Sequence, residues 1–438
     1  MRVYLSTVSR PVADPPGPGP RRGRFAMVSG NVIALGTVSL ITDVSAEMVA
    51  AVLPLYLVLG LNLSPVAFGV LDGVHTGATA LLRVVGGFAA DRFRRRKLIA
   101  GLGYALSAVA KLGLLLAGRS IPAIGAVIAV DRLGKGVRSA PRDALITLST
   151  PPEALGRAFG VHRAMDSFGA FLGPLAAFAV LLVVGQSYDA VFVTSFCIAA
   201  LAVVVLVLFV RERPTGPAAD GPAADGPAAD GPDDPKVSVR EAVGLLRGGP
   251  ARRLVLAAAM LGLATIGDGF VYLLLQRRMD LGLRWFPLLA VGTSLAYLLL
   301  AAPLGALADR IGRLPVVIGG YTALGATYLL LAGPVDGWPL IALALTLYGA
   351  FYAATDGVLI ALAGPVLPAR LRTTGIALVQ TGQALAYLVS SVLFGLAWQA
   401  WGPEHAVRAA AVAVAGVLVG TLLLLTSPSR PTTRKVLR

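Results

Sequence analysis

Apolar, almost uncharged stretches of about 20 residues recur along the whole chain, separated by short segments that carry charge or proline. A helix that rises about 1.5 Å per residue needs this length to cross the hydrocarbon of a bilayer. Twelve such stretches can be marked, at residues 30–59, 66–90, 97–117, 121–143, 156–185, 190–210, 254–276, 285–308, 315–332, 338–363, 373–400 and 404–426. The pattern predicts an all-α integral membrane protein with about twelve transmembrane helices.

The composition changes abruptly between the sixth and seventh stretches. Residues 216–230 are three consecutive copies of Gly-Pro-Ala-Ala-Asp, a segment with no apolar surface to offset the entropy of ordering it. We therefore expect a cytoplasmic tail at 1–29, a six-helix bundle at 30–210, a flexible cytoplasmic linker at 211–253 with a short amphipathic helix (237–246), a second six-helix bundle at 254–426 and a basic cytoplasmic tail at 427–438.

Composition and charge agree with a membrane protein. Hydrophobic residues make up 56% of the chain and charged residues only 14%, with a mean hydropathy of +0.77. If the N-terminus is cytoplasmic, most Lys and Arg of the +15 net charge lie in the inner segments, which predicts two cytoplasmic termini and no binding of nucleic acid. A cleaved signal peptide is the competing interpretation of the first stretch, but that stretch is too long and contains Asp43 and Glu47.

Two landmarks repeat between the two predicted bundles. Gly87-Phe-Ala-Ala-Asp91-Arg92 ends the second stretch, and Gly305-Ala-Leu-Ala-Asp309-Arg310-Ile-Gly-Arg313 ends the eighth. Asp143 precedes Pro152 by the same number of residues as Asp356 precedes Pro365. Internal repeats of this kind are typical of transporters that are built from two related halves.

The second of these motifs, Gly-x-Leu-Ala-Asp-Arg-x-Gly-Arg, resembles the signature of the major facilitator superfamily. The first copy departs from it, because Arg94 stands where glycine is expected. The resemblance implies two six-helix bundles related by a pseudo-twofold axis, and motif contacts that stabilise the outward-open state; the alternative is a plain helix-end turn. We assign gating roles to Gly87, Asp91, Arg92, Arg95, Arg142, Asp143, Gly305, Asp309, Arg310 and Arg313.

Two further motifs resemble elements of that superfamily. Arg132 and Gly136 in the fourth stretch match its Arg-x-x-x-Gly motif, and the wider string around them resembles a twelve-helix bacterial branch, which implies the bacterial plasma membrane. Gly169-x-x-x-Gly173-Pro174 resembles a motif associated with antiporters and favours export, although its final glycine pair is replaced. Glycine and proline at a helix interface also serve close packing and kinking alone.

Charge within the predicted bilayer is concentrated in the first six stretches. The acidic residues there are Asp43, Glu47, Asp72, Asp131, Asp143 and Asp166, and the basic ones are Arg83, Lys111, Arg132, Lys135, Arg138, Arg142 and Arg163. Buried charge is costly, so such residues usually face a partner or a wet cavity. The near balance indicates a paired network, which a substrate or a proton could reorganise; a static lattice that fixes helix register is the alternative.

We divide this network by the chemistry of its side chains. The candidates for reversible protonation are Asp43, Glu47, Asp131 and Asp166, and the candidates for holding an anionic substrate are Arg132, Lys135, Arg138 and Arg163. In the second half Asp268 and Asp356 have no intramembrane cation of their own half nearby in sequence, so they bind a proton or a cation or meet an Arg of the first half.

The three histidines and one cysteine are scattered, and the sequence contains no catalytic triad, nucleotide loop or metal motif. We therefore expect no enzyme, no cofactor and no metal site, but a monomeric secondary transporter that binds a small solute and protons in the bilayer. Proton-coupled export is the first hypothesis. Uptake of an organic anion with protons is the second, and a transport-inactive receptor or scaffold is the third.

Overall fold

A computed structural model describes residues 29–77, 95–151, 154–185, 187–212, 249–356 and 372–426. Its helices in the first half are α1 (Gly30–Leu55), which continues as the π-helix η1 (Tyr56–Gly60), a helix at 65–77, α3 (Arg96–Ala117), α4 (Ile121–Leu148), α5 (Leu155–Val184) and α6 (Tyr188–Phe209). The second half contains α8 (Gly249–Leu263), α9 (Asp268–Met279), the 3₁₀ turn η3 (Leu283–Trp285), α10 (Pro287–Ile311), α11 (Arg313–Ala332), α12 (Gly337–Thr355), α14 (Arg372–Trp401) and α15 (Pro403–Thr426).

The predicted all-α membrane architecture is confirmed. Ten helical spans in the described ranges are long and apolar enough to cross a membrane. Two other predicted spans correspond to α4, whose many charged residues keep it out of that set, and to the helix at 65–77, which runs into residues outside the described ranges. The two tails, most of the predicted linker with its amphipathic helix, and Gly87, Asp91 and Arg92 also lie outside them.

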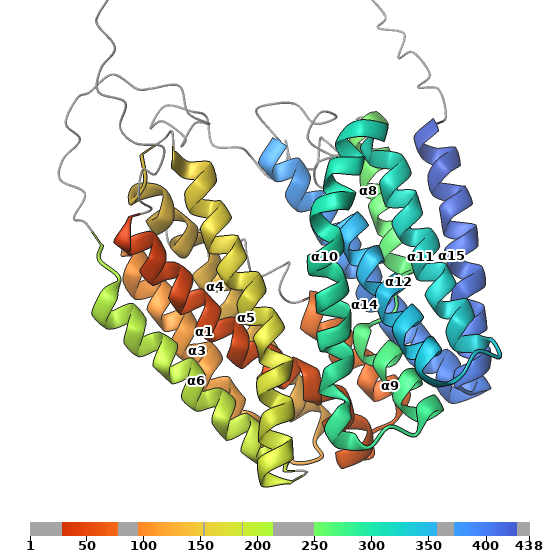
Figure 1. Ribbon diagram of the computed structural model, residues 1–438, viewed down its shortest axis with the longest axis horizontal. Coiled ribbons are helices and arrows are strands. Elements are labelled where there is room, and N and C mark those ends of the chain that lie inside the picture. Colours follow the sequence, from red (N-terminus) through yellow and green to blue (C-terminus); the bar gives the residue numbers. More distant parts are fainter. Residues whose placement is uncertain are drawn as a thin grey trace, which may run out of the picture.

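The helices form two groups that follow the chain order (Figure 1). In the first group α1 packs against α5 and α6, and α3 packs against α4 and α6. In the second group α8 packs against α14 and α15, and α11 packs against α12 and α15. Each pair in one group has its counterpart in the other at the same place in the chain order, as an internal repeat requires.

The two groups meet where α1 ends and where α9, η3 and α10 begin. Phe68 and Phe270 pack edge to face with ring centroids 4.7 Å apart, and the rings of Phe178 and Trp285 lie 5.5 Å apart. Residues 65–77 also lie against α14, where a Cβ on Gly395 would come within 3.0 Å of Val66 Cα. Aromatic rings and small residues thus make a dry contact between the halves at this end.

The seventh predicted span, 254–276, is not one continuous helix. Helix α8 ends at Leu263, and α9 begins at Asp268 after Gly267, whose backbone is extended (φ −64°, ψ 145°). The break is supported from α11, because the hydroxyl of Tyr328 accepts a hydrogen bond of 3.0 Å from the Ile266 N–H. A broken membrane helix frees backbone groups, which must find such partners inside the protein.

Candidate functional site

Helices α3 and α4 approach each other closely because glycines face each other at their crossing. A Cβ on Gly103 would lie 2.8 Å from the Gly134 carbonyl oxygen, and a Cβ on Gly134 would lie 2.9 Å from the Ser107 backbone nitrogen. Small residues at a crossing permit this backbone approach in a membrane. The contact brings Ser107 and Lys111 of α3 against Asp131 of α4.

Asp131 is surrounded by donors. Its carboxylate accepts hydrogen bonds from Ser107 Oγ, from Arg132 Nε at 3.0 Å and from Arg132 Nη2 at 2.5 Å, and it lies 3.5 Å from Lys111 Nζ. The side chain of Lys111 is 3% exposed and that of Arg132 is 9% exposed. One negative group therefore compensates two buried cations, and removing it would leave both unpaired.

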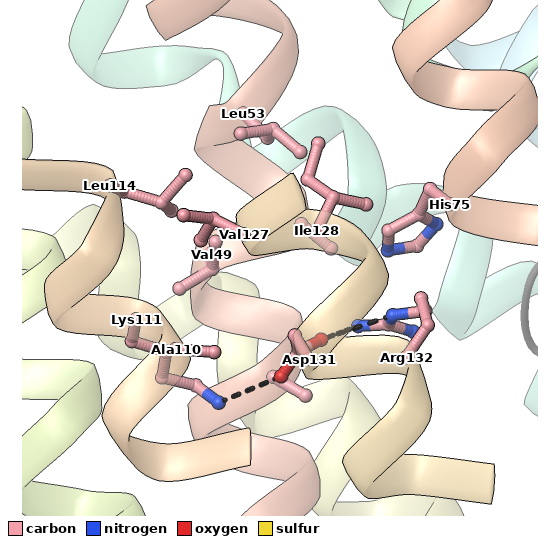
Figure 2. A pocket seen from close by; sticks show the side chains of 12 residues that line it. Val49, Leu53, His75, Ala110, Lys111, Leu114, Val127, Ile128, Asp131 and Arg132 are labelled. Atoms are coloured by element: carbon pink, nitrogen blue, oxygen red, sulfur yellow. Dashed lines mark hydrogen bonds and ion pairs between the residues drawn. The ribbon is translucent and has the colours of Figure 1, made fainter. Parts of the chain in front are cut away.

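This ion cluster forms one wall of a small pocket between α1, α3, α4 and the helix at 65–77 (Figure 2). The opposite wall is aliphatic and includes Val49 and Leu53 of α1 and Ile128 of α4, while His75 reaches in beside Arg132 from the helix at 65–77. Sequence reasoning noted Lys111 among the buried charges but did not select it as a site residue. Its spacing of one helical turn from Ser107 was the available signal.

Arg138 lies about two helical turns beyond Asp131 on α4. Its guanidinium stacks 4.6 Å from the centroid of the Tyr104 ring and stands 3.8 Å from Asp43 of α1, with the residue only 3% exposed. Nη1 of Arg138 is buried without a hydrogen-bond partner. The arrangement joins α1, α3 and α4 and leaves one donor for a water or a ligand.

A second cluster joins the ends of α4 and α5. Arg142 contacts Asp143 at 2.9 Å and Asp166 at 3.9 Å, and His162 Nε2 lies 3.0 Å from Ser39 Oγ. Asp166 Oδ1 is buried and has no hydrogen-bond partner. The structure thus brings Arg142, Asp143 and Asp166 together, whereas Arg163 is exposed and lies outside the described ion pairs.

Glu47 and Lys135 differ from their neighbours, because neither side chain takes part in a described hydrogen bond or ion pair. The charged groups that act on the Glu47 carboxylate are Lys135 and Arg132 of α4, Asp43 of α1 and Asp268 of α9. Glu47 therefore faces cations of its own half and an acid of the other half without being neutralised by direct contact. Glu47 is therefore a candidate for binding a proton or a solute.

The glycines that resemble the antiporter motif hold α5 directly against this part of α1. A Cβ on Gly173 would lie 2.6 Å from Glu47 Cβ and 2.8 Å from the Val44 carbonyl oxygen, and a Cβ on Gly169 would collide with the Leu40 backbone. Pro174 and Gly136 are buried in α5 and α4. The glycines set the distance between α1 and α5 along the stretch from Leu40 to Met48, which includes Glu47.

The acids of the second half meet tyrosines in the described structure, and no ion pair to an Arg of the first half is formed there. Asp268 accepts hydrogen bonds from Tyr348 at 2.7 Å and from Tyr352, both on α12. Asp356, which is exposed at the end of α12, accepts a 3.2 Å hydrogen bond from Tyr297. Asp268 thus lies inside the second half at the helix break, and Asp356 lies at its surface.

Much of the second copy of the gating motif is exposed in this conformation. A Cβ on Gly305 would meet no atom within 4 Å, and Asp309 and Arg310 are exposed at the end of α10. Arg313 begins α11, and Arg95 of the first copy is exposed just before α3. Across the described ranges, no group of three or more His, Cys, Asp or Glu could hold a metal ion.

The sequence profile of the Major Facilitator Superfamily matches residues 35–293 and 278–438. The chain belongs to the major facilitator superfamily. It is 30% identical over 379 residues to the uncharacterized MFS-type transporter MJ1317 of Methanocaldococcus jannaschii, covering 85% of this chain and 89% of that protein. The Mycobacterium tuberculosis protein Rv2265 is 37% identical over 158 residues, which are 36% of this chain and 38% of that protein.

Solved structures share the fold of this superfamily member at low sequence identity. The nucleoside transporter NupG superposes with a TM-score of 0.74 at 12% identity, covering 91% of this chain and all of that one. The D-xylose-proton symporter superposes with a TM-score of 0.67 at 18% identity, covering 91% and 97%. The chain is therefore a secondary transporter whose clusters lie within a two-bundle membrane fold.

Proposed function

We propose that this transporter exports a small solute from the bacterial cytoplasm in exchange for protons, with both termini in the cytoplasm. The two bundles rock around a central site that is reached alternately from each side. Glu47 binds the coupling proton. Lys135 and Arg132 on α4 favour its ionised form, so Glu47 releases its proton when solute binding changes their positions. Asp131, by contrast, serves to hold Lys111 and Arg132 in place.

The observation that carries this proposal is the position of Glu47. It lies on the α1–α5 contact made by Gly173, it acts electrostatically on groups of both halves, and it takes part in none of the described ion pairs. Protonating a carboxylate in such a place costs less free energy than protonating Asp131, because a protonated Asp131 would leave two buried cations unpaired. The resemblance of Gly169-x-x-x-Gly173-Pro174 to an antiporter motif supports exchange rather than co-transport.

The conformation supports alternating access. The described ring contacts between the halves gather where α1 ends and α9 begins, and the motif residues at the end of α10 are exposed. With a cytoplasmic N-terminus, the end of α1 faces the outside. We infer that this conformation is closed outward and accessible from the cytoplasm, with the cytoplasmic motif contacts opened.

Uptake of an organic anion together with protons is the second candidate. Lys135 has no ion-pair partner in the described ranges, and Arg163 is exposed. Both cations belong to the half that holds Glu47, so a carboxylate of a solute could complete the charge balance there.

A thermal-shift screen of the purified protein against nucleosides, pentoses, organic acids and cationic drugs would supply a ligand for transport assays. Proteoliposomes would then be loaded with that ligand and given an inwardly directed proton gradient. Exchange predicts that entering protons accelerate loss of the ligand from the vesicles. Accumulation of external ligand together with entering protons would reject export and favour the second candidate.

A further inference from the structure

Asp72 crosses the boundary between the two halves. It belongs to the helix at 65–77 in the first half, yet its carboxylate accepts hydrogen bonds from Ser391 at 2.7 Å and from Tyr387 at 3.2 Å, both on α14 of the second half. These partners are more than 300 positions away along the chain. The contact can exist only while the two halves are together at this end.

The same carboxylate lies against the break between α8 and α9. A Cβ on Gly267 would collide with Asp72 and would lie 2.9 Å from the Tyr387 hydroxyl, so the backbone just before Asp268 touches Asp72. Nearby, Gly269 is equally close to the first half, because a Cβ there would lie 2.8 Å from Pro54. The helix break therefore places the Asp72 carboxylate of the first half against the residue that precedes Asp268 of the second half.

In the part of the chain that the structure describes, the direct partners of Asp72 and Asp268 are hydroxyl groups rather than cations. The charged group that acts on Asp72 is Asp268, and its other partners on α14 are neutral. Asp268 faces Tyr348 and Tyr352 of α12 and also acts on Glu47 of α1. On the helix of Asp72 itself, His75 interacts electrostatically with Arg132, Asp131 and Lys135 of α4.

An ionised Asp72 and an ionised Asp268 repel each other, and the described residues provide no cation that pairs with either of them. Closure of this end becomes favourable when one of the two holds a proton, because protonation removes the repulsion and the carboxyl can donate to a hydroxyl group beside it. When the halves separate, water can hydrate both groups and the proton can leave.

We propose that Asp72 is a proton-dependent gating residue, which closes the outer end through Tyr387 and Ser391 when it and Asp268 hold one proton between them. This inference rests on the proposed proton-coupled function and deepens it, because it adds a gate that responds to protons apart from Glu47. Tyr387 and Ser391 act as positioning residues that make closure specific.

The gate can be tested by the distance between spin labels at Asn62 and Arg284, two exposed positions at the end where the halves meet, in a Cys197→Ser background. Double electron–electron resonance on the full chain in lipid nanodiscs would be recorded at mildly alkaline and mildly acidic pH. We expect the short-distance population to grow on acidification. Asp72→Asn, which cannot ionise, should give a large short-distance population at both pH values. The double variant Tyr387→Phe with Ser391→Ala should have a smaller short-distance population than the parent protein at both pH values.

Asp189→Asn, an exposed carboxylate at the start of α6, is the matched control and should keep the response of the parent protein. A parent protein without a pH response, or Asp72→Asn with an unchanged response, would overturn the proposal. If Asp72→Asn does not fold, Asp268→Asn serves as the second variant, and it too should lose the response. The measurement needs no solute, so the gate can fail while Glu47 still couples transport, and coupling can fail while the gate still responds.

Discussion

Two carboxylates on neighbouring helices, Asp131 and Glu47, have opposite surroundings. Asp131 is held by Ser107, Lys111 and Arg132, whereas Glu47 has no hydrogen-bond or ion-pair partner among the described residues. The same side-chain chemistry therefore serves two purposes. A fully paired acid fixes helix positions, and an unpaired one is free to change its protonation state.

This contrast predicts different stabilities for two neutral variants. Asp131→Asn should lower the free energy of unfolding by about 3–5 kcal/mol, because it leaves the buried Lys111 and Arg132 uncompensated. Glu47→Gln should remain within about 1 kcal/mol of the parent protein, because it breaks no described hydrogen bond. Thermal unfolding in detergent would measure both, and equal losses in the two variants would contradict the assignment.

At the scale of helices, the α1–α5 contact depends on glycines at particular positions. Gly173→Ala should destabilise the protein by about 1–3 kcal/mol, since its Cβ would meet Glu47 Cβ at 2.6 Å and the Met48 nitrogen at 3.0 Å. Gly160→Ala on the same helix has no atom within 4 Å of its Cβ and should gain about 0.5–1 kcal/mol. Thermal unfolding of the two variants compares them directly. Similar effects would show that α1 and α5 can move apart at Gly173 without loss of stability.

The break between α8 and α9 gives another prediction at this scale. Tyr328→Phe removes the hydroxyl that accepts from the Ile266 N–H, so a buried donor loses its partner and stability should fall by about 1–3 kcal/mol. Tyr188→Phe is a suitable control, because the Tyr188 hydroxyl enters none of the described hydrogen bonds. Hydrogen exchange at residues 264–267 should increase in Tyr328→Phe alone; unchanged exchange there would show that the break does not depend on α11.

The sequence predicted the positions of the helices, but it did not predict which side chains pair between helices. Length and hydropathy sufficed to place α1, α5 and α14 within a few residues, because each must span the same apolar thickness. The break at residues 264–267 was missed, since the segment is apolar and its backbone is satisfied by Tyr328 from another helix. Likewise, the sequence marked Lys111 and Asp72 as charges within the bilayer but did not reveal their partners on other helices. Such pairing depends on helix packing, which no local sequence pattern encodes.

At the scale of the whole molecule, ionisable groups lie in three places along the path between the halves. The cluster around Asp131 lies within the first bundle, Glu47 lies on the α1–α5 contact, and Asp72 meets the second bundle beside Asp268. A rocking motion leaves the cluster around Asp131 intact, changes which groups face Glu47 and breaks the contact of Asp72 with the second bundle. This order connects rigid support, coupling and gating in one movement.

The most direct test of the account is proton-driven transport by Glu47→Gln in proteoliposomes, with a ligand found by thermal shift and Glu404→Gln, an exposed acid on α15, as the control. We predict that Glu47→Gln retains exchange of labelled for unlabelled ligand but loses any acceleration by a proton gradient, while Glu404→Gln behaves like the parent protein. A Glu47→Gln protein whose transport still follows the proton gradient would contradict the assignment of Glu47 as the coupling residue.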